Sequence, residues 1–457
     1  MTDDHPLTEL TACPRCDKAP LTATSNGLRC DGCKIDFPSV DGVPWLFAEP
    51  ESSLGEWRNR LHFALQQLGH QSQRMQSELK ETEADSLTAE RLKRLIEGAD
   101  AHRNALRSLL SPVDIHSTPA SYESYLAMRT RLPADQGIAT YYANIHRDWV
   151  WGDAENQASI DQIVAVAGEK PLGDTLVLGA GASRLAYDVH RQLNTDRTIA
   201  TDFNPLLILT AKKVTEGNDV ELYEFPIAPK SIEDVAVRRM LTAPEPADDR
   251  FLYVLSDALR PPFGRATFDT VITPWLIDVI GEDLPVQAAR INHLLKPGGR
   301  WINFGSLTFD HPDARRRYST EETIDIVGNS GFDTPETVEA DIPYMCSPAS
   351  RHGRRESVFT FAATKTGDVK VPERHKSLPD WVVTGKEPVP ALETFRSQAV
   401  STQIHAYIMS LIDGKRTIED MAKILQQQNL MSEQEAIPAL RNFMTRMFDD
   451  SQKSSGF

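Results

Sequence analysis

The feature that most constrains the fold is the regular alternation of apolar strands and helices from residue 173 to residue 365. Helices are predicted to begin near Arg184 and Pro205, between short apolar segments that are predicted to be strands. These segments are T-L-V-L-G-A-G (175–181), T-I-A-T-D (198–202) and F-L-Y-V-L-S-D (251–257). Alternation of this kind predicts an α/β domain with a mostly parallel sheet covered by helices on both faces.

The second half of this domain carries its most distinctive segment. A predicted strand from Thr270 to Ile272 leads into T-P-W-L-I-D, then a helix, and then L-L-K-P-G-G-R-W-I-N-F-G-S-L, which contains another strand from Trp301 to Phe304. Asp278 is therefore expected at the carboxyl end of a strand. Open α/β sheets place their ligands at that edge.

Length and charge exclude several classes of protein. A chain of 457 residues is expected to form two to four domains. The net charge of −16 argues against a broad nucleic-acid-binding surface, which would need clustered Lys and Arg. No segment approaches the length of a membrane span, and the first residues lack the pattern of a signal peptide. A soluble, cytoplasmic protein is expected.

Four of the five cysteines form two C-x-x-C pairs near the N-terminus: Cys13, Cys16, Cys30 and Cys33. Two such pairs separated by a loop that can form a β-hairpin predict a tetrahedral Zn²⁺ site, and four thiolates favour a structural ion over a catalytic one. A redox C-x-x-C is the weaker alternative, because neither pair starts a helix in a βαβ unit.

The segment after the second pair, F-P-S-V-D-G-V-P-W-L-F (37–47), resembles the small zinc-ribbon proteins that partner and stabilise tRNA and translation-factor methyltransferases. That resemblance covers about 40 residues and implies a docking or stabilising role for the ribbon.

The residues after three predicted strands suit a nucleoside cofactor. Gly179 and Gly181 let backbone approach a ligand at a helix N-terminus, and Arg184 stands where a nicotinamide-binding fingerprint needs a small residue. Asp202 could accept hydrogen bonds from both ribose hydroxyls, and Asp257 could meet the adenine edge. Helix capping or loop solvation is the competing explanation for both carboxylates.

Residues 141–365 resemble the carnosine N-methyltransferases. The matching segments occur in the same order: R-D-W (147–149), L-V-L-G-A-G-A-S-R-L-A (176–186), L-Y-E-F-P (222–226), W-L-I-D (275–278), L-K-P-G-G-R-W-I-N-F-G-S-L (295–307) and Y-S-T-E-E to G-F (318–332). The resemblance implies transfer of a methyl group from S-adenosylmethionine (SAM) to an imidazole nitrogen. The domain is then expected to have the Rossmann-like SAM methyltransferase fold with a seven-stranded sheet.

The resemblance also implies residue roles. Asp278 would hydrogen-bond the imidazole, with Asn303 and Tyr344 nearby on the substrate side. The cofactor would be bound by Arg147, Gly179, Gly181, Arg184, Asp202, Asp257 and Trp275. The chain departs from the family at R-H-G-R-R-E-S (351–357), where the family has tyrosines. Arginines there suggest an anionic or larger acceptor than carnosine.

The full domain prediction is a zinc ribbon (1–50), a helical region (51–120), the methyltransferase domain (121–366), a linker (367–394) and a C-terminal module (395–457). L-I-D-G-K-R-T-I-E-D-M-A (411–422) in the last module resembles winged-helix modules that bind leader peptides, while a generic packing domain is an equal alternative. The acceptor could be a small molecule, a peptide or a protein histidine. Alternatives are another nitrogen or oxygen acceptor, or a non-catalytic scaffold that binds partners.

Overall fold

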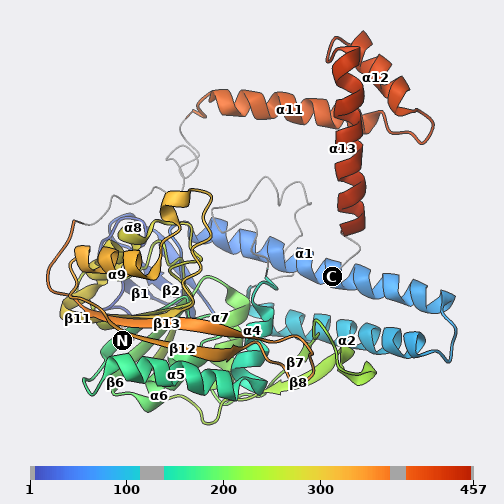
Figure 1. Ribbon diagram of the computed structural model, residues 1–457. Helices are drawn as coiled ribbons and strands as arrows, with labels where there is room; N and C mark the ends of the chain where they lie inside the picture. Colours follow the sequence, from blue (N-terminus) through green and yellow to red (C-terminus); the bar gives the residue numbers. More distant parts are fainter. Residues whose placement is uncertain (1–5, 114–137, 371–387, 454–457) are drawn as a thin grey trace. The chain divides into compact units, whose positions relative to one another are not determined.

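The computed structural model describes residues 6–113, 138–370 and 388–453 (Figure 1). It divides into two compact units, Met1–Ser377 and Leu378–Phe457. The division falls inside the predicted linker 367–394, of which residues 371–387 lie outside the described residues. The predicted boundary between residues 120 and 121 also lies outside them.

Seven strands form the expected core of the sheet. In spatial order they are β9 (Phe251–Ser256), β6 (Thr195–Asp202), β5 (Gly173–Leu178), β10 (Phe268–Pro274), β11 (Leu295–Gly305), β13 (Arg354–Thr364) and β12 (Glu336–Tyr344). All are parallel except β13, which pairs antiparallel with both of its neighbours. Numbered along the chain, the order is 3-2-1-4-5-7-6. It keeps the 3-2-1-4-5 order of the doubly wound Rossmann sheet, as a Rossmann-like methyltransferase fold requires.

The sheet is larger than the seven strands predicted. Within the described ranges it has eleven strands, four of which come from the N-terminal segment: β1 (Thr22–Thr24), β2 (Gly27–Arg29), β3 (Asp36–Val40) and β4 (Val43–Leu46). Strand β4 pairs in parallel with β9, with Trp45 opposite Leu255 and Leu46 opposite Ser256. An open edge strand leaves a row of backbone groups unpaired, and β4 covers the edge of β9. The zinc-ribbon segment is therefore continuous with the α/β domain.

Helices cover both faces of this sheet, as the alternating sequence predicts. Helices α5 (Asp153–Ala167), α6 (Arg184–Gln192) and α7 (Pro205–Thr215) pack with one hydrophobic cluster, and α8 (Leu284–Leu294) and α9 (Thr320–Asn329) pack with another. Figure 1 shows α8 and α9 on the opposite side of the sheet from α5 and α6. Because strand side chains alternate, Val177 joins the first cluster, and Leu176 and Leu178 join the second.

Two long helices precede the α/β domain, within the predicted helical region. Helix α1 (Pro50–Glu81) has proline in its first turn, and Ser86 caps α2 (Leu87–Leu109) by accepting the Ala89 N–H at 3.1 Å. In α1 the buried Trp57 ring lies 6.0 Å from Phe203, which directly follows Asp202. The segment that carries β4 and α1 therefore supports the carboxyl ends of β6 and β9.

Short elements complete the first unit. A separate antiparallel pair consists of β7 (Val220–Glu224) and β8 (Val237–Leu241), and α2 packs against β7. The remaining elements are η1 (Ser111–Val113), α4 (Tyr142–His146), the π-helix η2 (Arg147–Trp151), η3 (Ile232–Val235) and η4 (Ala314–Arg316). A π-helical turn is uncommon and is frequent at functional sites.

The second unit consists of helices α11 (Glu393–Ser410), α12 (Ile418–Gln427) and α13 (Glu433–Lys453). They share a core of their own that includes Ile408, Leu425 and Leu440. The predicted turn before α12 is present, with Asp413 accepting two backbone N–H groups and Thr417 capping the helix. Residues 388–453 contain no strand, so the wing of a winged helix is not among them.

None of the helices in the described ranges is long and apolar enough to cross a membrane.

Candidate functional site

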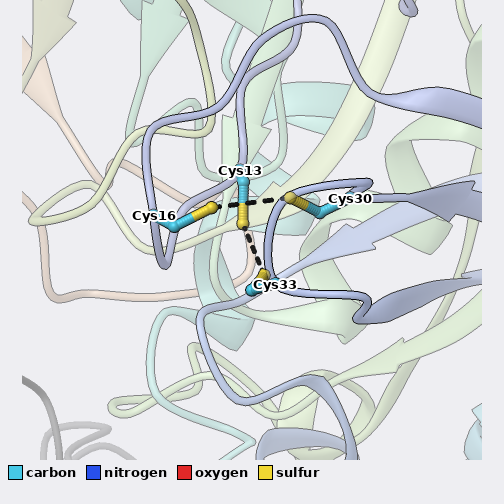
Figure 2. Close-up of side chains that lie close together, drawn as sticks. All are labelled: Cys13, Cys16, Cys30 and Cys33. Carbon is cyan, nitrogen blue, oxygen red and sulfur yellow. Dashed lines mark hydrogen bonds between the residues drawn. The ribbon is translucent and has the colours of Figure 1, made fainter.

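The four cysteines of the two C-x-x-C pairs come together as predicted. Figure 2 shows their sulfur atoms pointing toward one another from two loops. The Cys13 and Cys33 sulfurs lie 3.5 Å apart, as do those of Cys16 and Cys30, and all four lie within 4.8 Å of one another. A tetrahedral Zn²⁺ with Zn–S bonds of about 2.3 Å requires sulfurs about 3.8 Å apart. The cluster therefore fits one zinc ion.

The two loops have the same backbone geometry. The N–H groups of Cys13 and Cys30 each donate at 2.9 Å to the carbonyl five residues ahead, and the residue after each second cysteine has a positive φ. Burial would raise the pKa of Cys30, but the backbone N–H of Cys33 and nearby thiols outweigh it and lower the pKa to about 7. A lowered pKa favours the thiolate that a metal needs. Burial has the opposite effect on Cys13 and Cys33 and raises the pKa of both thiols.

The loop after β5 has the geometry of a ligand cradle. Gly179 and Gly181 have φ angles of +69° and +57°, a region that disfavours side chains. A Cβ on Gly179 would lie 2.6 Å from Leu276 Cδ1, so the Leu276 side chain would have to shift to admit it. A Cβ on Gly181 would meet no described atom within 4 Å. Space next to Gly181 is therefore open to a ligand at the start of α6.

Asp202 and Asp257 both lie at the carboxyl ends of their strands. The Gly181 N–H donates to Asp202 Oδ2 at 2.9 Å, which joins the glycine loop to the end of β6. Asn204 donates to the other oxygen at 2.9 Å. Burial raises the pKa of Asp202 to about 6, against these backbone N–H groups, and burial also raises the pKa of Asp257. Asp257 accepts the Leu259 N–H at 2.8 Å.

Arg147 belongs to a buried ion-pair network in η2 and α5. Its guanidinium lies 2.7 Å from Asp148 Oδ1 and 3.3 Å from Glu155 Oε1. The other Asp148 oxygen accepts the Arg184 N–H at 3.4 Å, at the start of α6. Glu155 also accepts the Met345 N–H at 2.7 Å. The network therefore connects the glycine loop to the loop after β12.

Arg184 is fixed by further contacts of the same network. Its guanidinium donates to the Asp148 carbonyl at 2.8 Å and to both Asp188 oxygens at 3.0 Å, and it lies over the Trp149 ring. This packing agrees with the sequence argument against a nicotinamide fingerprint, since a bulky side chain occupies the position.

Asp278 lies in a turn four residues beyond the last residue of β10, and not on the strand end itself. Its Oδ2 accepts the Thr308 N–H at 2.7 Å, which ties the loop after β10 to the loop after β11. Burial raises the pKa of Asp278, and the Thr308 N–H opposes the shift. The carboxylate therefore stands between two loops at the carboxyl edge.

Trp275 and Tyr344 form an aromatic pair at this edge. Trp275 has a φ of +49° and donates its N–H to the Phe304 carbonyl at 2.6 Å. Its ring lies 5.0 Å from the ring of Tyr344, the last residue of β12. Burial raises the pKa of Tyr344, and Arg147 opposes that shift, so the two side chains are electrostatic neighbours.

Asn303 has a different environment from the other candidates. It is 1% exposed, and its amide lies 2.9 Å from the Thr273 hydroxyl, which also accepts the Trp301 Nε1–H at 2.9 Å. This network lies inside the sheet between β10 and β11. Asn303 is therefore placed to support the loop positions that follow both strands, and it does not reach the surface.

The acidic partners of Arg147 did not emerge as site residues from the sequence. Asp148 lies in the R-D-W segment, but its contacts with Arg184 depend on chain segments 36 residues apart. Glu155 and Met345 are 190 residues apart. Glu155 lies in a helix that otherwise packs on the sheet. Carboxylates are rarely buried without a partner, so an acid in such a helix is the only local sign that Glu155 takes part in the site.

No protein-family model matches the chain, and no curated protein matches it. Several solved structures are similar. Phosphoethanolamine N-methyltransferase 2 of Haemonchus contortus, bound to phosphomonomethylethanolamine and S-adenosylhomocysteine, is 15% identical with a TM-score of 0.33; the match covers 50% of this chain and 58% of that one. This chain therefore spans less than two thirds of that enzyme.

Two further structures are similar over half of this chain. The N-methyltransferase NodS of Bradyrhizobium japonicum, bound to S-adenosylhomocysteine, is 13% identical over 50% of this chain and 99% of its own, with a TM-score of 0.34. A structure from Haloferax volcanii, a complex that contains the Trm112 methyltransferase activator, is 12% identical with a TM-score of 0.35. The match covers 50% of this chain and 97% of that one. At these TM-scores the likenesses assign no function to this chain.

Proposed function

We propose that this chain is a SAM-dependent N-methyltransferase whose acceptor is an imidazole nitrogen of a small molecule, peptide or protein. The observation that carries the proposal is the meeting of Gly181, Asp202 and the Arg147 network at the carboxyl edge that Asp278 also borders. In open α/β sheets ligands bind at this edge. The sequence resemblance to the carnosine N-methyltransferases supplies the acceptor.

The cofactor part of the site suits the chemistry of SAM. A carboxylate has about four lone-pair sites, so Asp202 can accept ribose hydroxyls in addition to the two backbone N–H groups it already binds. The open space at Gly181 admits a ligand close to the backbone. Asp257, at the end of the next strand, would meet the adenine. Arg147, 14% exposed, would bind the amino-acid end of the cofactor.

Asp278 would orient the acceptor. Its Oδ2 accepts one backbone N–H, which leaves lone pairs for an imidazole ring N–H. A carboxylate that accepts one ring N–H fixes the tautomer and directs the lone pair of the other nitrogen toward the methyl group. It also stabilises the positive charge that develops on the ring. Imidazole, with a pKa of about 6.5, is mostly neutral at pH 7 and needs no strong base.

The remaining chemistry is alignment. Methyl transfer from a sulfonium is an in-line displacement, so the protein has to hold the nucleophile close to the methyl carbon and exclude water. Trp275 and Tyr344 provide a half-buried aromatic wall at the same edge of the sheet as Asp278. Asn303 would act from behind this wall, by holding Thr273 near the end of β10.

The four cysteines would hold a structural zinc ion. Zinc would fix the ribbon whose strand β4 covers the edge of β9, the strand that leads to Asp257. We infer that the ribbon stabilises the α/β domain within the same chain, in the way that its sequence resemblance to methyltransferase-partner proteins suggests.

The test is incubation of the full-length protein with methyl-labelled SAM and histidine-containing acceptors: imidazole dipeptides, histidine peptides and cell extract. Asp278→Ala should retain SAM binding and lose about 100-fold in turnover, as expected for loss of a group that aligns the acceptor. Asp325→Ala, which removes an exposed carboxylate on α9, is the matched control and should keep full turnover. Unchanged turnover in Asp278→Ala would refute the role assigned to this residue.

A further inference from the structure

Two loops beside the aromatic wall are joined to each other by backbone contacts. Residues 226–231 follow β7, and residues 346–355 form the loop before β13 and its first two residues; together they are called the basic clasp. Pro229 and Ser350 form an antiparallel bridge, the Arg351 N–H donates to the Ala228 carbonyl at 2.7 Å, and the Lys230 N–H donates to the Ala349 carbonyl at 3.1 Å. The clasp is thus two loops whose backbones are held against each other.

The basic clasp is also anchored to the proposed site. The Ser347 hydroxyl donates to Glu224 at the end of β7, and the Met345 N–H just before the clasp donates to Glu155 of the Arg147 network. The Arg354 guanidinium lies over the Tyr344 ring, 4.6 Å from its centre. Since Tyr344 also packs on Trp275, the clasp borders the place where the acceptor would bind.

The charge of the basic clasp is all of one sign. P-I-A-P-K-S and C-S-P-A-S-R-H-G-R-R contain four cationic side chains, Lys230, Arg351, Arg354 and Arg355, and no Asp or Glu, in a chain whose net charge is −16. Arg354 pairs with Glu356. Within the described residues, the other three cations form no ion pair with a carboxylate and donate to the carbonyls of Pro348, Lys230 and Asp341.

We propose that the basic clasp is an anion subsite for the methyl acceptor, which then carries a carboxylate or phosphate group next to its imidazole. The proposal rests on the proposed function. Gathering like charges costs energy, and here backbone bridges hold together the two loops that carry them. Arginine forks match carboxylate and phosphate oxygens, and a local positive field in an acidic protein attracts anionic ligands.

This subsite accounts for the departure from the carnosine methyltransferases. Carnosine carries an amine and a carboxylate, so it has no net charge near neutral pH. An acceptor that lacks the free amine has no cationic group for the clasp to repel. An acceptor that carries phosphate or further carboxylates has more negative charge for the clasp to attract. The clasp therefore selects acceptors by net negative charge, while Asp278 selects the ring.

The experiment compares two acceptors that differ in one charge, N-acetylhistidine and the neutral N-acetylhistidinamide, with SAM and full-length protein. The wild type should show a KM about tenfold lower for the anion, as expected for one or two exposed charge-assisted hydrogen bonds. Lys230→Ala/Arg351→Ala should remove this preference by raising the KM for the anion, with little change in kcat or in the neutral acceptor. Equal KM values in the wild type would overturn the proposal.

Controls separate charge from folding. Arg315→Ala removes an arginine that is 88% exposed in η4 and should leave the preference intact. Lys230→Arg/Arg351→Lys keeps both positive charges and should keep most of the preference for the anionic acceptor. Two further acceptors, histidinol phosphate and the capped peptide Glu-His-Glu, are compared by their KM values. The lower KM shows whether the anionic group is the phosphate of a small molecule or the carboxylates of a peptide. A preference retained by the double alanine variant would place the anion elsewhere and refute the assignment.

Direct binding separates this proposal from the proposed function. Titration of the same acceptor pair into the protein saturated with S-adenosylhomocysteine measures the subsite without turnover. If the anion binds more tightly through Lys230 and Arg351 but no acceptor gains label, the imidazole transfer is wrong and the anion subsite stands. If label is transferred with no charge preference, the transfer stands and the anion subsite is wrong.

Discussion

Substitution of Gly181 tests the cofactor cradle with the least disturbance of the rest of the domain. Gly181 has a φ of +57°, and a Cβ there would meet no described atom within 4 Å. Gly181→Ala therefore adds the backbone cost of a left-handed residue, about 1–2 kcal/mol, and no clash with the protein. If a ligand lies against this backbone, the new methyl group overlaps it.

The expected loss of affinity follows from that overlap. Overpacking by one methyl group costs about 1–3 kcal/mol, which corresponds to about a 5- to 150-fold increase in Kd for SAM. Gly179→Ala acts differently, because its Cβ would lie 2.6 Å from Leu276 Cδ1; clash and backbone strain together should lower the free energy of unfolding by about 2–5 kcal/mol.

Gly298→Ala is the matched control for this experiment. Gly298 also has a positive φ, +75°, and free space for a Cβ, but it lies at the amino end of β11, on the opposite edge of the sheet. For the three variants, calorimetric titration gives the Kd for SAM and urea unfolding gives the free energy of unfolding. Gly181→Ala and Gly298→Ala should lose similar stability, and only the first should lose SAM affinity. Wild-type affinity in Gly181→Ala would refute the cradle.

Two further predictions concern metal and pH. Purified protein should contain about one zinc per chain; Cys16→Ser or a strong chelator should remove it and lower the unfolding midpoint, whereas Cys346→Ser, outside the cluster, should keep it. Metal-free wild type of unchanged stability would contradict this role. Because burial raises the pKa of Asp202 to about 6, SAM affinity should fall as the pH drops below about 6, where this carboxylate takes up a proton. The folded state binds that proton more tightly than the unfolded chain, so the free energy of unfolding should fall, by up to about 3 kcal/mol, as the pH rises from about 4 to 6. Asp202→Asn should remove both dependences, and persistence of either would refute the assignment.

The parts of the fold that depend on local pattern could be predicted from the sequence. Helices α6 and α7 begin at Arg184 and Pro205, as expected from the periodicity and the turn residues. The two cysteine pairs met across the β1–β2 hairpin for the same reason, because their spacing alone fixes the geometry.

Features that depend on distant segments could not be predicted. The pairing of β4 with β9 joins segments about 210 residues apart, and an edge strand carries no sequence mark of its partner. The sequence placed Asp278 at a strand end, whereas its position depends on the Thr308 N–H, 30 residues away. Asn303 was predicted to lie on the substrate side, and its contact with Thr273 across the β10–β11 pair joins residues 30 positions apart. The arginines of residues 351–357 suggested an anionic acceptor, but the pairing of this loop with residues 226–231 is visible only in the structure.

The most direct test of the central claim is calorimetric titration of SAM into the full-length protein. The meeting of Gly181 and Asp202 at one edge of the sheet predicts saturable binding with one site per chain and competition by S-adenosylhomocysteine. Absence of binding at high SAM concentration, in protein that is folded and contains zinc, would contradict the assignment of this chain as a SAM-dependent methyltransferase.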